Sequence, residues 1–263
     1  MRGVACVTHC FYSARPHVTA PSSAAGVYFL NSHIFLCRAK RHWVILDVVR
    51  DKYLCVDRVQ FESLGPWIQG WEDEQAHRPD PAAGPPPSAI ALASSLLTIG
   101  ILSEESAGAK EARATAYNHP TAALNLDESG STRPSRSTHA LSFFLGCRSA
   151  DRQLRHQRFE SIVAAVQARK SAVQDAARPF DLERARPLLA VFARLRLLYP
   201  RPYLCLFDSL ALIHFLARFD LYPDWVFGVR ADPFEAHCWV QAGERVLNDT
   251  LERVSALTPI MSI

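Results

Sequence analysis

The chain has 263 residues and a formal net charge of +3, with 49% hydrophobic and 21% charged residues. This composition is typical of a globular protein with one large or two smaller domains, and so mild a charge favours neither nucleic acid nor a membrane as partner. It excludes a membrane-spanning helix, because no stretch approaches the roughly 18 apolar residues that crossing a bilayer requires.

The first 25 residues read as an N-terminal extension without a secretory signal, because their short apolar run is broken by charged residues and histidines. The seven cysteines are odd in number and lie within strand-like and helical patterns. This argues against a secreted disulfide framework and predicts a cytoplasmic protein. Cys6, His9 and Cys10 are of metal-binding types, but no second pair at ligand spacing accompanies them, so we predict no metal site.

We predict that residues 26–105 form a small sheet followed by helices. Segments rich in β-branched and aromatic residues, separated by turn signals, predict strands at 27–30, 33–37, 42–49 and 53–57. Helical patterns follow at 61–71 and 88–102, and Ser88 is the expected N-cap of the second helix. That helix carries no Arg or Lys, so we do not expect a winged-helix DNA binder, whose recognition helix needs cations for phosphates and base edges.

Residues 106–139 are rich in small residues and include "DESGSTRPSRST" (127–138), which predicts a flexible linker. Between 140 and 263 the periodicity is first helical and then strand-like. We predict helices around 159–166, 188–199 and 205–217, and strands at 225–229, 235–241 and 245–249. Helices followed by antiparallel strands predict an α+β domain.

Cys205 is the candidate nucleophile. Pro200 and Pro202 force an extended approach, so the following helix can begin only near Cys205. A thiol in the first turn of a helix feels the positive end of the helix dipole, which favours the reactive thiolate. The unpaired backbone N–H groups of that turn can stabilise an oxyanion.

His237 and Asp249 are the expected base and its orienting group, and both lie on one predicted hairpin. Direct cross-strand pairing of these residues requires Gln241 opposite Arg245 and a three-residue loop; in another register Asn248 would be the orienting group. A Cys–His–Asp order arises easily by chance in this chain, and free cysteines are usually buried and inert. The order therefore needs a second line of support.

The C-terminal motifs supply it. They are "YLCLFDSLALIHFLARF" (203–219), "VFGVRADPFEAHCWVQAGERVLND" (226–249) and the closing "LTPIM". Together they resemble the lasso-peptide leader peptidases of the bacterial transglutaminase-like superfamily. The resemblance implies a catalytic triad of Cys205, His237 and Asp249. Cys238 stands where these proteins commonly have alanine, and strand alternation predicts that it faces away from His237.

The N-terminal part resembles the leader-recognition domain of fused members of this family, which is winged-helix-like. Here "HWVILDVVRDKYLCVD" (42–57) is similar to its central hairpin and "LLTIGIL" (96–102) to its last helix. By this resemblance the leader peptide adds as a strand beside the third strand. The expected contacts are Tyr53, Leu54, Cys55 and Val56.

The resemblance implies a cysteine peptidase that removes the leader of a lasso-peptide precursor, without a cofactor of its own. Its expected partners are the precursor peptide and an ATP-dependent lasso cyclase. Two alternatives stay open: another acyl-transfer enzyme of the superfamily, such as an amidase or transglutaminase, and a non-catalytic leader-binding protein. We expect Trp225, Trp239, Tyr199 and Tyr203 to serve mainly in packing, and His214 to be structural.

Overall fold

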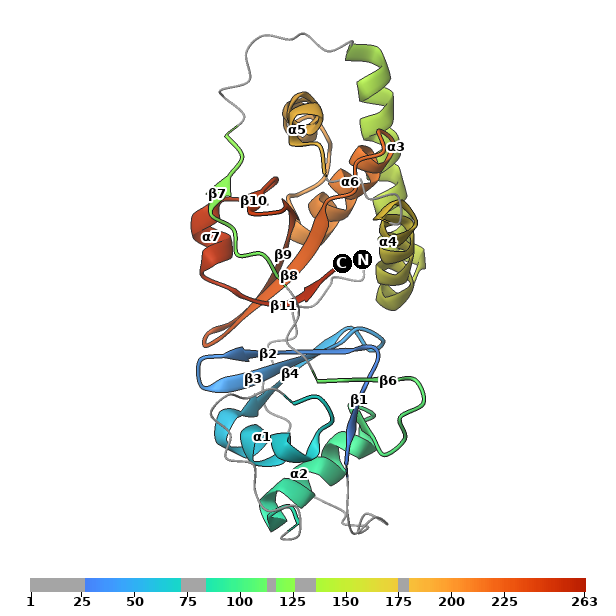
Figure 1. Cartoon of the computed structure of the whole chain (residues 1–263). Coiled ribbons are helices and arrows are strands. Elements are labelled where there is room, and N and C mark those ends of the chain that lie inside the picture. Colours follow the sequence, from blue (N-terminus) through green and yellow to red (C-terminus); the bar gives the residue numbers. More distant parts are fainter. Residues whose placement is uncertain (1–26, 72–83, 113–116, 126–135, 175–179) are drawn as a thin grey trace. The chain divides into compact units, whose positions relative to one another are not determined.

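The computed structural model describes residues 27–71, 84–112, 117–125, 136–174 and 180–263. The chain forms two compact units (Figure 1). The C-terminal unit contains the described residues from 117 to 228 together with Ala236–Ile263, and the N-terminal unit contains the described residues up to 112 together with Val229–Glu235. Helices and sheets occur in both, which confirms the predicted α+β class. The extension at 1–25, with Cys6, His9 and Cys10, lies outside the described residues.

The N-terminal unit contains two three-stranded sheets and a few helices. Its strands are β1 (Phe29–Asn31), β2 (Ile34–Ala39), β3 (His42–Asp47), β4 (Lys52–Asp57), β5 (Leu102–Ser103) and β6 (Ala109–Lys110). Its helices are α1 (Arg58–Leu64), the 3-10 turn η1 (Gly65–Trp67) and α2 (Pro87–Thr98). The sheets have the orders β2-β3-β4 and β5-β1-β6.

The predicted hairpin of β3 and β4 is confirmed as an antiparallel pair. Its turn forms because Asp47 accepts hydrogen bonds from the backbone N–H of Arg50, at 2.9 Å, and from its guanidinium, at 2.6 Å. Asp51 completes the turn with a left-handed φ of 54°, a conformation that aspartate tolerates better than most residues.

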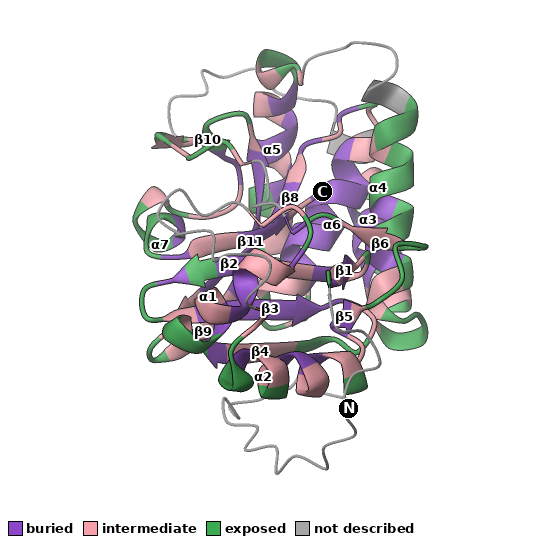
Figure 2. Cartoon of the chain, turned by 60° about the horizontal axis from the view of Figure 1, so that its bottom comes forward, coloured by how far each residue is buried: buried purple, intermediate pink, exposed green. Residues whose placement is uncertain are grey.

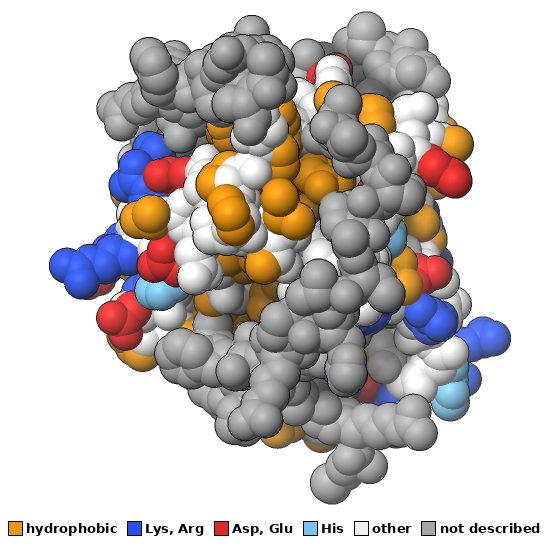
Figure 3. All heavy atoms as spheres, turned by 90° about the horizontal axis from the view of Figure 1, so that it is seen from below, with side chains coloured by type: hydrophobic (Ala, Val, Ile, Leu, Met, Phe, Trp, Pro, Cys, Tyr) orange, Lys and Arg blue, Asp and Glu red, His pale blue; other side chains and the backbone are white. Residues whose placement is uncertain are grey.

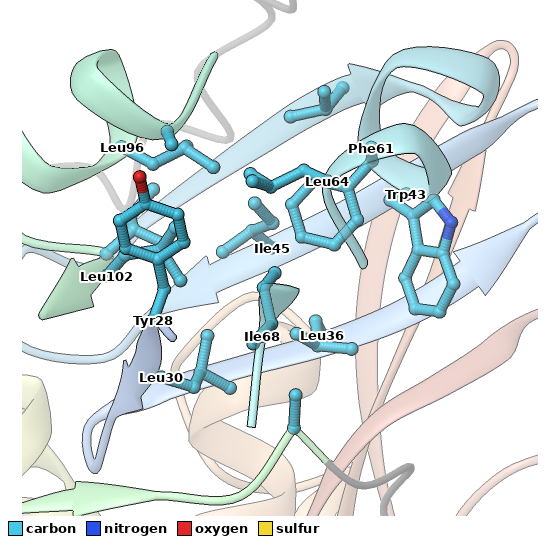
Figure 4. Close-up of a cluster of buried hydrophobic side chains, with 14 of the residues drawn as sticks. Tyr28, Leu30, Leu36, Trp43, Ile45, Phe61, Leu64, Ile68, Leu96 and Leu102 are labelled. Carbon is cyan, nitrogen blue, oxygen red and sulfur yellow. The ribbon is translucent and has the colours of Figure 1, made fainter. Parts of the chain in front are cut away.

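The core of this unit lies between the strands and the helices α1 and α2 (Figure 4). Its apolar side chains come from every part of the predicted sheet-plus-helix module. The members shown in Figure 4 include Tyr28, Leu30, Leu36, Trp43, Ile45, Phe61, Leu64, Ile68, Leu96 and Leu102. Burial of so many large side chains is the main stabilising contribution to a sheet this small.

Two helix boundaries differ from the sequence prediction. α1 begins three residues earlier than predicted, at Arg58, because the Asp57 side chain caps the backbone N–H groups of Val59 and Gln60. α2 begins at Pro87 rather than after an N-cap at Ser88, since proline is well suited to a first helical position. It ends at Thr98, shortly before Gly100 adopts a φ of 67°.

The C-terminal unit places four helices before its sheet. The helices are α3 (Arg136–His156), α4 (Phe159–Gln174), α5 (Leu182–Arg196) and α6 (Cys205–Ala217). After them come β8 (Asp224–Ala231), β9 (Phe234–Ala242), β10 (Arg245–Val246), the short α7 (Leu251–Ser255) and β11 (Thr258–Ser262). With β7 (Ala122–Ala123), the sheet has the order β11-β8-β9-β10-β7.

Helix α6 is buried along most of its length (Figure 2), from Phe207 to Leu216. It packs closely against α3 at Gly146, where a side chain would lie 3.1 Å from the carbonyl oxygen of Ala211 and 3.3 Å from the Cα of Phe215. Ser209, on the same helix, donates a hydrogen bond to the Cys238 carbonyl of β9 at 3.3 Å. Helix α6 is thus held against both a helix and the sheet.

The predicted pairing of His237 opposite Asp249 within the hairpin is wrong. Arg245 pairs with Ala242, not with Gln241, so the loop is Gly243-Glu244 rather than three residues long. Continued as a ladder, this register would put Asp249 opposite Cys238. The strand ends instead at Val246, and the chain bends before it reaches Asp249.

Described parts of 106–139, which we predicted to be a flexible linker, have regular structure. β6 joins the N-terminal unit, β7 pairs with β10, and α3 begins at Arg136. The Tyr117 hydroxyl bonds to Gln241 at 3.1 Å. The prediction of a tether is therefore wrong for these segments; residues 113–116 and 126–135 lie outside the described part of the chain.

Candidate active site

Cys205 is the first residue of α6, as predicted from the two prolines before it. Leu204 precedes it in an extended conformation, with φ −138° and ψ 118°, and provides no side-chain cap. The first regular helical hydrogen bond runs from the Asp208 N–H to the Leu204 carbonyl, at 2.9 Å. The N–H groups of Cys205, Leu206 and Phe207 therefore come before the hydrogen-bond ladder of the helix.

His237 and Asp249 are hydrogen-bonded to each other although they are not cross-strand partners. The distance from His237 Nε2 to Asp249 Oδ2 is 2.5 Å, and His237 is 3% exposed. The other carboxylate oxygen accepts the Thr250 N–H at 2.8 Å. Since Nε2 is engaged with Asp249, Nδ1 is the ring nitrogen left for the hydrogen bond that His237 makes with Cys205.

The surroundings of Cys205 favour the thiolate. The largest influence is a hydrogen bond from the Cys238 thiol, which lowers the pKa of Cys205; burial raises it, and the hydrogen bond and charge of His237 lower it. Together they hold the pKa of Cys205 at about 4, against an ordinary value of 9.0. The sulfur is thus negatively charged at neutral pH.

The imidazole is correspondingly held as the cation. Burial alone would lower the pKa of His237, but its hydrogen bonds to Asp249 and Cys205, and their charges, raise it to about 9. For Asp249, burial opposes ionisation, but the hydrogen bonds from His237 and Thr250 outweigh it and lower its pKa. The three side chains form a chain of alternating charge, in which the two macroscopic titrations near pH 4 and 9 belong to the coupled pair.

Cys238 also takes part in this site, through Cys205 rather than through His237. Its thiol and its backbone N–H both donate hydrogen bonds to Cys205. It is 3% exposed, and burial together with the neighbouring thiolate raises its pKa well above the usual range. A thiol that stays protonated is a suitable hydrogen-bond donor to a thiolate.

Asn248, expected as an alternative orienting group for His237, instead forms hydrogen bonds to β9 and to α6. Its Oδ1 accepts the Val240 N–H at 2.7 Å, and its Nδ2 donates to Ser209 Oγ at 3.0 Å. In a continued ladder that N–H would bond to the Leu247 carbonyl, because the Leu247 N–H already bonds to the Val240 carbonyl at 2.9 Å. The Asn248 side chain thus substitutes for the ladder where the chain bends toward His237.

The residues expected to pack divide into two groups. Trp225 and Trp239 are fully buried, and Tyr199 stacks on Phe207 at a centroid distance of 5.8 Å, as predicted. His214 is turned away from the sulfur, toward Gln153 and Arg169. Tyr203 differs: it is 56% exposed, and its hydroxyl donates to the Asn248 carbonyl at 3.3 Å.

The candidate leader-binding residues lie on β4, as predicted. In the described part of the chain, β4 has β3 as its only sheet neighbour and is an edge strand. The ring of Tyr53 lies 5.5 Å from that of Phe234, Leu54 packs against the core, and Val56 is buried. Cys55 is disulfide-bonded.

The described residues also bear on metal, membrane and nucleic-acid binding. No group of three His, Cys, Asp or Glu side chains there could hold a metal ion, and none of the helices there is long and apolar enough to cross a bilayer. α2 contains no charged residue. In the view of Figure 3, hydrophobic side chains gather near the middle, and charged side chains lie toward the sides.

Comparison with known proteins agrees with the geometry in the C-terminal unit. Residues 147–262 match the family described as the Transglutaminase-like superfamily. This range contains Cys205, His237 and Asp249. No curated protein and no solved structure matches the chain.

Proposed function

We propose, from the premise that residues 147–262 form a transglutaminase-like domain, that this protein is a cysteine peptidase that removes the leader peptide from a lasso-peptide precursor. Domains of this superfamily typically act as cysteine peptidases or catalyse acyl transfer. The observation that carries the proposal is the hydrogen-bonded arrangement of Cys205, His237 and Asp249, with the pKa of the thiol lowered to about 4.

In the first half of the reaction, the Cys205 thiolate attacks the carbonyl carbon of the scissile bond. The N–H groups at the start of α6 stabilise the oxyanion that forms. The His237 imidazolium then gives its proton to the departing nitrogen, which becomes the amino terminus of the core peptide. The leader remains on the enzyme as a thioester.

In the second half, neutral His237 takes a proton from water, and the hydroxide adds to the thioester carbonyl. Collapse of this intermediate releases the leader as a carboxylate and restores the thiolate. Asp249 keeps the imidazole in one orientation and stabilises its cationic form throughout, as the third member of a catalytic triad does. This chemistry requires no cofactor from the protein itself.

The edge strand β4 supports leader recognition. An extended peptide can add to the edge strand of a sheet through main-chain hydrogen bonds, while alternate side chains contact pockets beside it. Tyr53, Leu54, Cys55 and Val56 lie on that strand. An amidase or transglutaminase would not need a leader-reading module, so the presence of the N-terminal sheet module favours the proposed function over its closest alternative.

The product of this reaction determines the proposed partner. Cleavage exposes a free amine on the core peptide, and formation of a macrolactam from that amine requires activation of a carboxylate. We therefore assign the ATP-dependent step to a separate lasso cyclase, working with this protein in the cytoplasm.

The test is to mix the full chain with the precursor peptide encoded nearest its gene and to follow leader release by mass spectrometry. We expect a single cleavage by the wild-type protein and none by Cys205→Ala or His237→Ala. Cys147→Ala is the matched control, because Cys147 is a buried free cysteine in the same unit. Unchanged cleavage by Cys205→Ala would reject the mechanism. If the wild type binds the leader without cleaving it, the protein is a non-catalytic leader-binding protein. If it transfers an acyl group to an amine without hydrolysis, it is a transferase.

Leader recognition is tested separately with the full-length Cys205→Ala variant and a labelled leader peptide, followed by fluorescence anisotropy. Proline substitution along the leader removes one N–H at a time. If the leader adds as a strand, binding is lost with a period of two, because alternate N–H groups face β4. A loss that depends only on the leader's side chains would argue against strand addition.

A further inference from the structure

A buried ion pair lies beside the candidate nucleophile and has no role in the mechanism so far. Arg196, at the end of α5, contacts Asp208, in the first turn of α6, through Nε and Oδ1. Their side chains are 11% and 3% exposed, respectively. Neither residue stood out in the sequence, where Arg196 is one of several arginines on a helix.

The two oxygens of Asp208 have different partners. Oδ1 binds Arg196, and Oδ2 accepts the N–H of Leu204 at 2.7 Å. The N–H of Asp208 in turn donates to the Leu204 carbonyl at 2.9 Å. Both main-chain groups of the residue before Cys205 are therefore fixed by Asp208.

Arg196 fixes the segment that leads to Leu204. Its guanidinium donates to the carbonyl oxygens of Arg201 at 3.1 Å and Pro202 at 3.0 Å, and to that of Tyr199 at 3.4 Å. This segment contains Pro200 and Pro202, which have no N–H to offer to a neighbouring carbonyl. One planar side chain with several donors thus supplies the hydrogen bonds that the segment cannot make for itself.

Stability alone does not account for such a pair. Moving two charges out of water costs about as much as their attraction returns, so buried pairs are weak contributors to stability. This pair is instead placed where geometry matters, one turn from Cys205. Arg196 also neutralises the charge of Asp208. Asp208 lies three residues after Cys205 and is therefore its neighbour on the helix, so an unpaired carboxylate there would disfavour the Cys205 thiolate.

We infer that Arg196 and Asp208 are positioning residues, which hold the main chain at Leu204 so that the sulfur of Cys205 and the first N–H groups of α6 face the same carbonyl group. The inference rests on the proposed role of Cys205 as nucleophile. It concerns acyl transfer in particular, since only that reaction forms an oxyanion next to those N–H groups.

The experiment compares two reactions of Cys205 in the full-length protein. Iodoacetamide alkylates the thiolate and displaces iodide without forming an oxyanion. With 4-nitrophenyl acetate, the thiolate attacks the ester carbonyl, forms a thioester and displaces 4-nitrophenolate through an oxyanion. Peptide mapping by mass spectrometry assigns both products to Cys205. The ratio of acylation rate to alkylation rate, taken where the thiol is fully ionised, reports the geometry alone.

We expect this ratio to fall by about 100-fold in Asp208→Asn and in Arg196→Met, the loss that a displacement near 1 Å can cause. The midpoint of the alkylation profile should rise in Arg196→Met, where a carboxylate is left unpaired, and should not rise in Asp208→Asn. His237, Cys238, Asp249 and Tyr203, the other titratable groups near the sulfur, are unchanged in both variants.

Lys170→Met is the matched control, because the Lys170 side chain is as buried as that of Arg196 and also pairs with a carboxylate, Asp224, in the same unit. It should lower the melting temperature without changing the ratio. Arg196→Lys keeps the charge but not the planar set of donors, so its ratio should also fall; this variant decides the question if Arg196→Met does not fold. A wild-type ratio in the folded Asp208→Asn and Arg196 variants would overturn the inference.

These results are separable from the proposed function. Neither probe is a peptide, so failure to cleave a lasso precursor would leave the outcome unaffected. Conversely, a wild-type Cys205 with an ordinary thiol titration would remove the basis of the proposed peptidase, whatever the two variants show.

Discussion

At the scale of single residues, Cys205 depends on hydrogen-bond donors that come from β9. Cys238 contributes both its thiol and its N–H. A neutral donor stabilises a thiolate in the same way that a cation does, by favouring the charged form. The candidate triad is therefore better described with Cys238 as a fourth contributor.

Substitutions of Cys238 test this contribution. Cys238→Ala removes the thiol donor and should raise the pKa of Cys205, so that alkylation by iodoacetamide slows at pH 5 and recovers at higher pH. Cys238→Ser keeps a donor of similar size and should behave like the wild type. An alanine variant with an unchanged profile would show that the Cys238 thiol has no part in activating Cys205.

Cys205, His237 and Asp249 were predicted as one site from the prolines that locate the start of α6 and from the resemblance of the C-terminal motifs to a known family. The sequence was insufficient for Cys238, Arg196 and Asp208. The alternation of side chains along β9 predicts which face of the sheet Cys238 is on, but not that the first residue of α6, Cys205, contacts it. Arg196 contacts main-chain carbonyls of an irregular segment, and no periodic pattern records such contacts.

At the scale of elements, the join between β10 and α7 makes the site possible. The predicted pairing of His237 with Asp249 was wrong because it required the hydrogen-bond ladder between the two strands to continue to Asp249. Instead Asn248 bonds to Val240 and Ser209, which ends the ladder and ties the bend to α6. A side chain that replaces a backbone partner in this way cannot be identified from the spacing of residues.

Asn248→Ala should therefore weaken the fold around the site. It leaves the buried N–H of Val240 without its acceptor, a loss of about 1–3 kcal/mol in the free energy of unfolding. Urea denaturation followed by circular dichroism measures this loss. Ser209→Ala removes the hydrogen bond from Asn248 and the long one to the Cys238 carbonyl, but it leaves the Val240 N–H paired and should therefore cost less. Equal costs for the two substitutions would contradict the proposed role of Asn248.

Element boundaries in the N-terminal unit were predicted better than those in the middle of the chain. The hairpin of β3 and β4 has six-residue strands, long enough to show a β pattern. β6 and β7 have two residues each, and their small side chains carry no recognisable period. Pairing with distant strands, rather than local propensity, determines such short elements.

At the scale of the whole molecule, stability should depend on pH through His214. Burial, followed by the charge of Arg169, lowers the pKa of this histidine from 6.5 to about 4. The folded protein therefore binds fewer protons than the unfolded chain between these values, so stability falls as the pH falls from 6.5 to 4. The separation corresponds to roughly 3 kcal/mol.

Urea denaturation at a series of pH values tests this dependence. His214→Gln has no proton to bind, so its unfolding free energy should fall less steeply than that of the wild type between pH 6.5 and 4. The carboxyl groups shared by both proteins contribute equally to the two curves. Parallel curves would contradict the assignment of this titration to His214.

The central claim is that the fold makes Cys205 a thiolate paired with an imidazolium. The most direct measurement is the rate of its alkylation by iodoacetamide as a function of pH, with the modified peptide identified by mass spectrometry. The claim predicts a half-maximal rate near pH 4 in the wild type, and a midpoint well above that in His237→Gln. A wild-type midpoint near 9, the ordinary value for a thiol, would contradict it.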